Sequence, residues 1–424
     1  MTQNLEDGLL GPEGEDWRVP VSELAARINR LSKDLAAEGQ AGALIQTPVD
    51  LYYYCGGRQN GTLFVPAYGT DASINGGGDG SVFFVRRSIS RAKYEAGGDD
   101  SPFEIASFPR MKAFGEELAN RGLSKPLGLQ KAEIPTNFSS RFEQAVAMFG
   151  PSSDISSVVH RQRETKSPWE LKMMKQGAII QNEMFEAVRN TLKTGITELD
   201  LVAAAESVSR GSGFGGNVQM RRYPLQCDRA VIVSGRAGGI PSFFDSAIGG
   251  TGPHPLSGMG SGFNKIAENQ PILVDLVHVH RGYVVDATRM FCIGNLDAVW
   301  HQRLEDMNLV NQKVVESLAN NENCSLAWQK GHDLASELGY EGHLMGMKPD
   351  QSMFLGHSVG LQLDESPVVA KGFDRPMEAG MTMAIEPKVV YQDGSVGLED
   401  TWVKTESGIE RLTLDGWNPT LVRG

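Results

Sequence analysis

Apolar positions between residues 20 and 155 predict a small domain that mixes helices and strands. Leucine and isoleucine recur at helical spacing and predict a first helix over about 21–38, ending near Gly39. Short apolar runs separated by Gly-rich loops follow at 43–45, 51–55, 63–65 and 82–85. Two further helices and one strand are expected at 111–120, 139–149 and 127–129.

After residue 163 the pattern changes to long helices with clear start signals. Ser167 can cap a helix, Pro168 suits its first position, and Glu170 completes a capping box. Thr197 repeats the capping pattern and opens a second helix. Two more helical stretches are expected at 295–319 and 325–338. The sequence therefore predicts a larger, separate second domain.

Residues 273–289 read as a β-hairpin that carries one aspartate in each arm. Asp275 and Asp286 lie in β-branched runs on either side of an Arg281-Gly282 turn. Strand alternation lets both carboxylates reach the same face. A buried carboxylate is costly unless it is paired or binds a metal, so the pair suggests a cation site. Two solvated acids on edge strands remain the alternative for this stretch alone.

Three more candidate ligands follow the hairpin. His357 opens an apolar segment, and Glu386 and Glu399 each stand alone in apolar, strand-like surroundings. Each residue alone is weak evidence for a metal site, because a single acid in a strand is usually exposed. Four carboxylates and one imidazole together would suit two divalent metals that share bridging acids and hold a nucleophilic hydroxide.

Composition narrows the class of protein. The 424 residues are 40% hydrophobic and 22% charged, as is ordinary for a globular protein. A net charge of −12 argues against a nucleic-acid partner, which would need a basic surface. Four scattered cysteines favour a reduced, cytoplasmic protein. We expect no secretory signal and no membrane association, because residues 1–16 lack an apolar core and no apolar run reaches membrane-spanning length.

The order and spacing of these residues resemble the pita-bread metallopeptidases of family M24. Methionine aminopeptidase, prolidase and Xaa-Pro aminopeptidase share a pattern of two aspartates eleven apart, then His, Glu and Glu. The matching positions here are Asp275, Asp286, His357, Glu386 and Glu399. The two-part layout is similar to the prolidase branch, and the resemblance covers nearly everything after the first twenty residues.

The resemblance implies an α+β architecture in two domains. A tail over 1–19 would precede a creatinase/prolidase-type α/β domain over 20–155, and a pita-bread catalytic domain would occupy 156–424. It also implies two divalent ions, drawn from Mn, Co, Fe or Zn, and a homodimer formed through residues 20–155 and the loops near His254.

The positions of three further histidines predict their roles. His254, twenty-one residues before Asp275, stands where prolidase-like enzymes keep a substrate-facing histidine, and we expect it to bind the scissile carbonyl or to carry a proton. His278 and His280 lie on the face opposite Asp275 by strand alternation, so we expect them to pack or to be solvated.

Two departures from the family pattern affect the expected chemistry. Peptidases of the family usually carry a second histidine seven residues after the ligand histidine, and here that position is Asp364. An aspartate does not donate to an oxyanion unless it is protonated, so Asp364 is expected to anchor a substrate ammonium or to act as a base. Gly397 replaces an arginine that often stands two residues before the last ligand.

The predicted function is hydrolysis of a peptide bond near the amino terminus, with Xaa-Pro as the expected substrate. Glu386 would take the proton of the attacking water, and His254 would steady the intermediate. The alternative is a metal-dependent lyase, or another amide hydrolase of the same fold, with Asp364 as its base. A metal-free creatinase-like amidine hydrolase and a non-catalytic binding protein both fit five intact ligands poorly.

Overall fold

The computed structural model describes residues 10–73, 79–223, 225–227, 230–414 and 420–422. The chain divides into two compact units, Met1–Arg163 and Glu164–Gly424. The division lies at the end of helix α6 (Ser156–Glu164), eight residues after the boundary between 155 and 156 that the sequence predicts.

The first unit is built on a six-stranded sheet in the order β4-β3-β2-β1-β5-β6. Its other elements are α1 (Val21–Ala37), β1 (Gly42–Ile45), α2 (Pro48–Cys55), β2 (Gly61–Pro66), β3 (Val82–Val85), α3 (Ile89–Glu95), β4 (Glu104–Ser107), α4 (Phe114–Asn120), β5 (Gly128–Leu129), α5 (Thr136–Val146) and β6 (Ser153–Asp154). Phe84, Phe114 and Phe142 lie in its buried core, and Phe114 contacts each of the other two edge to face.

The apolar run 51–55 is helical, whereas the other three short runs are strands. Thr47 accepts a hydrogen bond from the backbone of Asp50, and Pro48 occupies the first helical position. These two start signals favour a helix because they satisfy, or remove, backbone N–H groups that would otherwise lack a partner.

The second unit begins with the two helices whose starts the sequence predicts. They are α7 (Pro168–Thr191) and α8 (Glu198–Gly211), and a complete capping box is present at Ser167 and at Thr197. The remaining helices are α9 (Ala298–Ala319) and α10 (Cys324–Glu337).

Three sheets make up the rest of the second unit, in the orders β17-β9-β8-β7, β11-β10-β12-β15-β16 and β13-β14. Their strands are β7 (Ala230–Ser234), β8 (Ile272–His280), β9 (Tyr283–Ile293), β10 (Phe354–Ser358), β11 (Glu365–Ala370), β12 (Thr382–Ile385), β13 (Lys388–Tyr391), β14 (Gly394–Gly397), β15 (Asp400–Thr405), β16 (Gly408–Arg411) and β17 (Thr420–Val422). Strands β8 and β9 form the predicted hairpin, and Arg281 and Gly282 both have positive φ at its turn.

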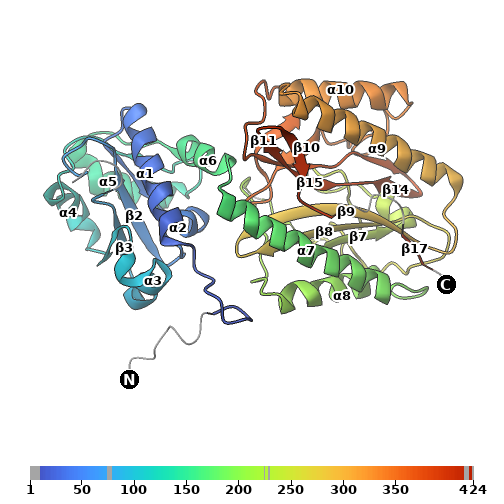
Figure 1. The fold of residues 1–424 in the computed structure, drawn as a ribbon, viewed down its shortest axis with the longest axis horizontal. Helices are drawn as coiled ribbons and strands as arrows, with labels where there is room; N and C mark the ends of the chain where they lie inside the picture. Colours follow the sequence, from blue (N-terminus) through green and yellow to red (C-terminus); the bar gives the residue numbers. More distant parts are fainter. Residues whose placement is uncertain (1–9, 74–78, 224, 228–229, 415–419, 423–424) are drawn as a thin grey trace. The chain divides into compact units, whose positions relative to one another are not determined.

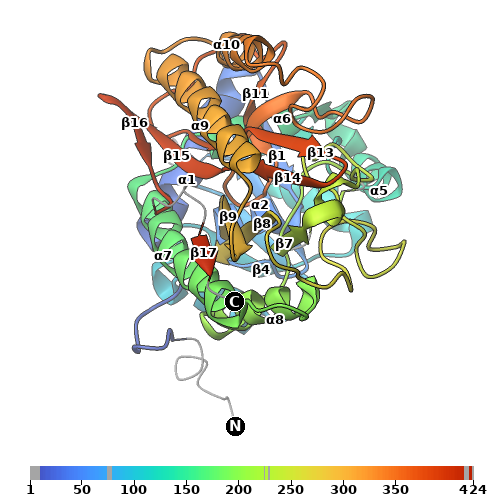
Figure 2. The same cartoon turned by 90° about the vertical axis from the view of Figure 1, so that its right-hand side faces the viewer.

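The helices of the second unit cover its sheets in pairs. Helices α7 and α8 pack on β7, β8 and β9, while α9 and α10 pack on the strands that follow them in sequence (Figures 1 and 2). Each pair has its own buried core. The strands therefore lie between two layers of helices, as expected for the pita-bread domain. Within the described residues, no helix is both long and apolar enough to cross a bilayer.

Candidate metal centre

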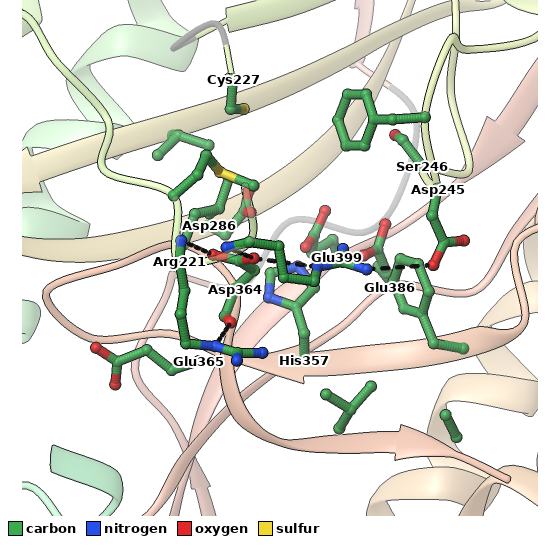
Figure 3. Close-up of a pocket in the computed structure, with 18 of the residues that line it drawn as sticks. Arg221, Cys227, Asp245, Ser246, Asp286, His357, Asp364, Glu365, Glu386 and Glu399 are labelled. Carbon is green, nitrogen blue, oxygen red and sulfur yellow. Dashed lines mark hydrogen bonds and ion pairs between the residues drawn. The ribbon is translucent and has the colours of Figure 1, made fainter. Parts of the chain in front are cut away.

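The five predicted ligands line one cavity of the second unit. Asp275 lies on β8, Asp286 on β9 and His357 on β10, while Glu386 directly follows β12 and Glu399 directly precedes β15. The cavity has a volume of about 350 Å³. Figure 3 shows Asp286, His357, Glu386 and Glu399 grouped at its centre.

The register of the hairpin turns both aspartates toward the cavity. Asp286 pairs with Val277, and Asp275 pairs with Thr288. Thr288 also forms an isolated bridge with Glu399 and donates from its hydroxyl to Glu399 Oε2 over 2.9 Å. The hairpin and the carboxy-terminal strands thus meet at the carboxylates themselves.

Asp286, His357 and Glu399 fit a metal ion. One potential ligand atom from each lies within 4.8 Å of those of the other two. Oδ1 of Asp286 and Oε1 of Glu399 are buried, and neither has a hydrogen-bond partner among the described residues. Buried carboxylate oxygens without a donor are costly, and a divalent cation would satisfy both.

Lys388 joins the same cluster of carboxylates. Its Nζ lies 3.1 Å from Asp275 Oδ2, 2.6 Å from Glu386 Oε2 and 2.8 Å from Glu399 Oε2. The side chain is only 1% exposed. Sequence reasoning missed this residue, although strand alternation from Glu386 would have placed it on the same face.

The ionisation of the cluster reflects burial and crowding. Burial and the charge of Glu399 raise the pKa of Asp286 well above its usual value. Burial, with the charge of Glu386, also raises the pKa of Glu399, although Lys388 opposes this. One ammonium therefore does not balance the buried acids, and a further cation would stabilise their ionised forms.

Glu386 and His357 behave differently from these two acids. Burial would raise the pKa of Glu386, but the charge of Lys388 and the hydrogen bond to His357 outweigh it and lower the pKa. Burial would lower the pKa of His357, but Glu386, 3.4 Å from its Nε2, raises that pKa to about 8. In the protein without metal, Glu386 is thus the ionised partner of His357.

Asp364 also lines the cavity, where it is held by two arginines. Its Oδ1 accepts from the backbone N–H of Arg221 over 2.5 Å, and its Oδ2 accepts from the backbone and from Nε of Arg222. Figure 3 shows Asp364 and Arg221 beside the central carboxylates. Arg222 also approaches Asp245 at 3.7 Å. A base at Asp364, as the lyase alternative requires, would have to compete with these donors.

The remaining histidines lie away from the described cavity. His254 is exposed in a turn closed by Ser257, and it is not among the described residues that line the cavity. His278 and His280 are buried on the opposite face of β8, so close to α7 that a Cβ added at Gly177 would lie 3.3 Å from Cβ of His280 and 3.7 Å from Cδ2 of His278. The pair packs against helices, one of the two outcomes that strand alternation predicts.

Together, the fold and the clustered acids and histidine form a candidate metal centre in a pita-bread domain, which a separate α/β domain precedes in the chain. Residues 172–406 match metallopeptidase family M24, and residues 27–165 match the creatinase/prolidase N-terminal domain. The chain therefore belongs to metallopeptidase family M24.

Individual relatives are distant in sequence. The Xaa-Pro dipeptidase of Pyrococcus furiosus is 21% identical over 388 residues, which cover 91% of this chain and 97% of that protein. The Xaa-Pro dipeptidase of Lactobacillus helveticus is 23% identical over 264 residues, 62% of this chain and 63% of that protein. Among solved structures, the Xaa-Pro dipeptidase of Bacillus anthracis matches with a TM-score of 0.76 at 18% identity, covering 94% of this chain and all of that one. The dipeptidase PepE of Mycobacterium ulcerans matches equally well.

Proposed function

We propose that this protein is a metal-dependent peptidase that hydrolyses a bond near the amino terminus of a short peptide, with Xaa-Pro dipeptides as its substrate class. The observation that carries the proposal is the convergence of all five predicted ligands in one cavity, where two buried carboxylate oxygens have no donor among the described residues. Xaa-Pro dipeptidases among the relatives support the choice of substrate.

The side chains of the cavity would have different roles in the reaction. A divalent ion bound there would activate water and polarise the scissile carbonyl. Glu386, ionised and adjacent to His357, would accept the proton of the water and return it to the leaving amine. Mn, Co, Fe and Zn all suit a mixed carboxylate and imidazole site. His254 enters this scheme only if a partner subunit or a rearrangement of its loop brings it to the cavity.

The walls of the cavity suit a small peptide with an apolar residue and a terminal carboxylate. Phe244, Phe354 and Phe373 supply apolar surface for a pyrrolidine ring. Arg221 and Arg222 supply guanidinium groups, which bind carboxylates well. Asp364 would then act by positioning these two arginines, because its main-chain carbonyl accepts from Nε of Arg221 and its Oδ2 accepts from Nε of Arg222.

The proposal is tested with metal-stripped protein reconstituted separately with Mn²⁺, Co²⁺, Fe²⁺ and Zn²⁺. Release of proline from Ala-Pro should depend on the added ion and should exceed hydrolysis of Ala-Gly. His357→Ala should lower kcat/KM by about 100-fold or more, since it removes a ligand. His301→Ala, on α9 and outside the described cavity lining, is the matched control and should leave the rate unchanged.

Two results would count against this function. One is the absence of proline release with every ion, in protein whose circular dichroism shows that it is folded. The other is turnover that persists unchanged after His357 is removed.

A further inference from the structure

We infer that Lys388 supplies one of the cations of the centre, so that this member of the family binds a single divalent ion where the sequence pattern predicts two. The inference deepens the proposed function, because it concerns the same site. It rests on how the carboxylate oxygens are shared between the ammonium and the remaining ligand atoms.

The ammonium of Lys388 is fully engaged by three of the predicted ligands. It takes one oxygen each from Asp275, Glu386 and Glu399, at 2.6–3.1 Å. An ammonium has three N–H donors, so these contacts use all of them. They also occupy oxygens that a second ion would need.

The ligand atoms left over suit one ion. Asp286 Oδ1 and Glu399 Oε1 are buried and have no donor among the described residues, and His357 lies with them in the only His/Asp/Glu/Cys group of ligand spacing found in the described part of the chain. Asp275 and Glu386, the two predicted ligands outside that group, are both partners of Lys388. The five residues thus separate into a metal-type set and a set held by the ammonium, with Glu399 shared between them.

The pairing of β13 with β14 fixes the position of the Lys388 side chain in the cluster of carboxylates. Lys388 of β13 pairs directly with Gly397 of β14. A Cβ added at Gly397 would lie 2.5 Å from Cγ of Lys388 and 2.6 Å from the carbonyl oxygen of Pro387. Only glycine at 397 therefore leaves the stem of Lys388 its present course.

A second divalent ion would be opposed in two ways. It would compete for the oxygens of Asp275 and Glu386, and it would be repelled by a buried ammonium that lies against the same carboxylates. In a site removed from water, repulsion between like charges at such short range is much stronger than at the surface. Moving the ammonium away would leave it buried without partners, which is also costly.

The test counts ions and does not depend on catalysis. Isothermal titration of metal-stripped full-length protein with Mn²⁺ should saturate at one ion per chain, and elemental analysis after dialysis should agree. Electron paramagnetic resonance should show an isolated Mn²⁺ and no exchange-coupled pair. Two ions per chain of comparable affinity, a coupled spectrum, or no bound ion would each overturn the inference, whatever the protein hydrolyses.

Two variants extend the test. Lys388→Ala should take up a second ion, because it frees oxygens of three carboxylates and removes the repelling charge. Lys404→Ala removes another buried lysine of the same unit, whose Nζ donates to the carbonyls of Leu318 and Ala319, and it should still bind one ion. If Lys388→Ala, folded by thermal melting with Mn²⁺ present, also stops at one ion, the inference fails.

Discussion

Glu399 binds Lys388 and also belongs to the group of residues that could hold a metal ion. Its Oε2 accepts from Lys388 and from the Thr288 hydroxyl, while its Oε1 has no donor among the described residues. Two donors on one oxygen fix the orientation of the carboxylate and leave the other oxygen facing the cluster. Such outer contacts hold a ligand in place before the ion arrives.

Asp364 provides a prediction at the same scale. Asp364→Asn turns one acceptor oxygen into a donor, so it loses either the hydrogen bond from the backbone of Arg221 or the two from Arg222. We expect kcat/KM for Ala-Pro to fall about tenfold, at the lower end of what a charged hydrogen bond contributes. We expect the loss in KM, since the arginines would bind substrate and not the reacting atoms.

Asp245→Asn is the matched control for that variant. It weakens the other, exposed contact of Arg222, at 3.7 Å, and should change kcat/KM by much less. A fall in kcat for Asp364→Asn, with loss of the limb of the pH profile that a base produces, would instead favour Asp364 as the base that the sequence suggested.

At the residue scale, the five residues that the sequence predicts as ligands lie in one cavity, but the sequence does not predict the residues that bind them. Asp275 and Asp286 are recognisable because a short hairpin sets their spacing and alternation sets their face. The partners of Asp364 lie more than a hundred residues earlier in the chain, and no local pattern connects them. Lys388 was within reach of strand alternation, but a lone lysine in a strand is usually exposed.

Among the elements, the hairpin β8–β9 has one face at the centre and the other against helices. On the helical side, Nδ1 of His278 lies 2.8 Å from the hydroxyl of Ser209 on α8, and its Nε2 has no partner among the described residues. Burial, together with the nearby His280, lowers the pKa of His278 to about 3. This imidazole is therefore neutral in the folded protein.

Because His278 is buried and neutral, we predict that the folded protein loses stability in acid. Between pH 6.5 and about 3 the unfolded chain binds a proton at His278 that the folded chain does not, so stability is lost as the pH falls through this window. From pH 7 to pH 5 this single group should remove about 2 kcal/mol from the free energy of unfolding.

The measurement is urea unfolding of wild type and His278→Gln at both pH values. Glutamine does not titrate, so the variant should lose less stability on acidification, although burial of its amide will lower stability at pH 7. Parallel losses in the two proteins would show that His278 is not the group responsible.

The element scale also shows where sequence patterns suffice. Helices α7 and α8 begin where their capping boxes predict, because the signal and the structure that it produces lie within four residues. For residues 51–55 the apolar composition alone does not distinguish a helix from a strand. The cap at Thr47 and the proline at the first helical position favour the helix. The strands that join Glu399 to the hairpin depend on contacts between distant segments, which periodicity does not contain.

At the scale of the whole molecule, we predict a homodimer formed through residues 20–155 and the loops near His254. Exposed apolar side chains in those loops support it, since Leu256 is 93% exposed and Phe263 is 70% exposed. Sedimentation velocity at micromolar concentration should give a dimer, and Leu256→Glu should raise its dissociation constant by roughly tenfold or more.

Ile179→Glu is the control for the added charge, because Ile179 is exposed on α7, outside the predicted interface. It should leave the dimer intact. A protein that sediments as a monomer would contradict the predicted assembly, and equal weakening by both variants would contradict its location.

The pairing of Lys388 with Gly397 across β13 and β14 has a consequence for how the two positions evolve. A lineage that gains the lysine while a side chain remains at 397 would bring that side chain against the stem of the lysine, and one that loses the side chain first would have no cation in its place. Neither step is favourable alone, so the two positions should change together and then persist together. Relatives with a lysine at the position of 388 should carry glycine opposite it, and this two-residue signature would mark a separate branch within the family.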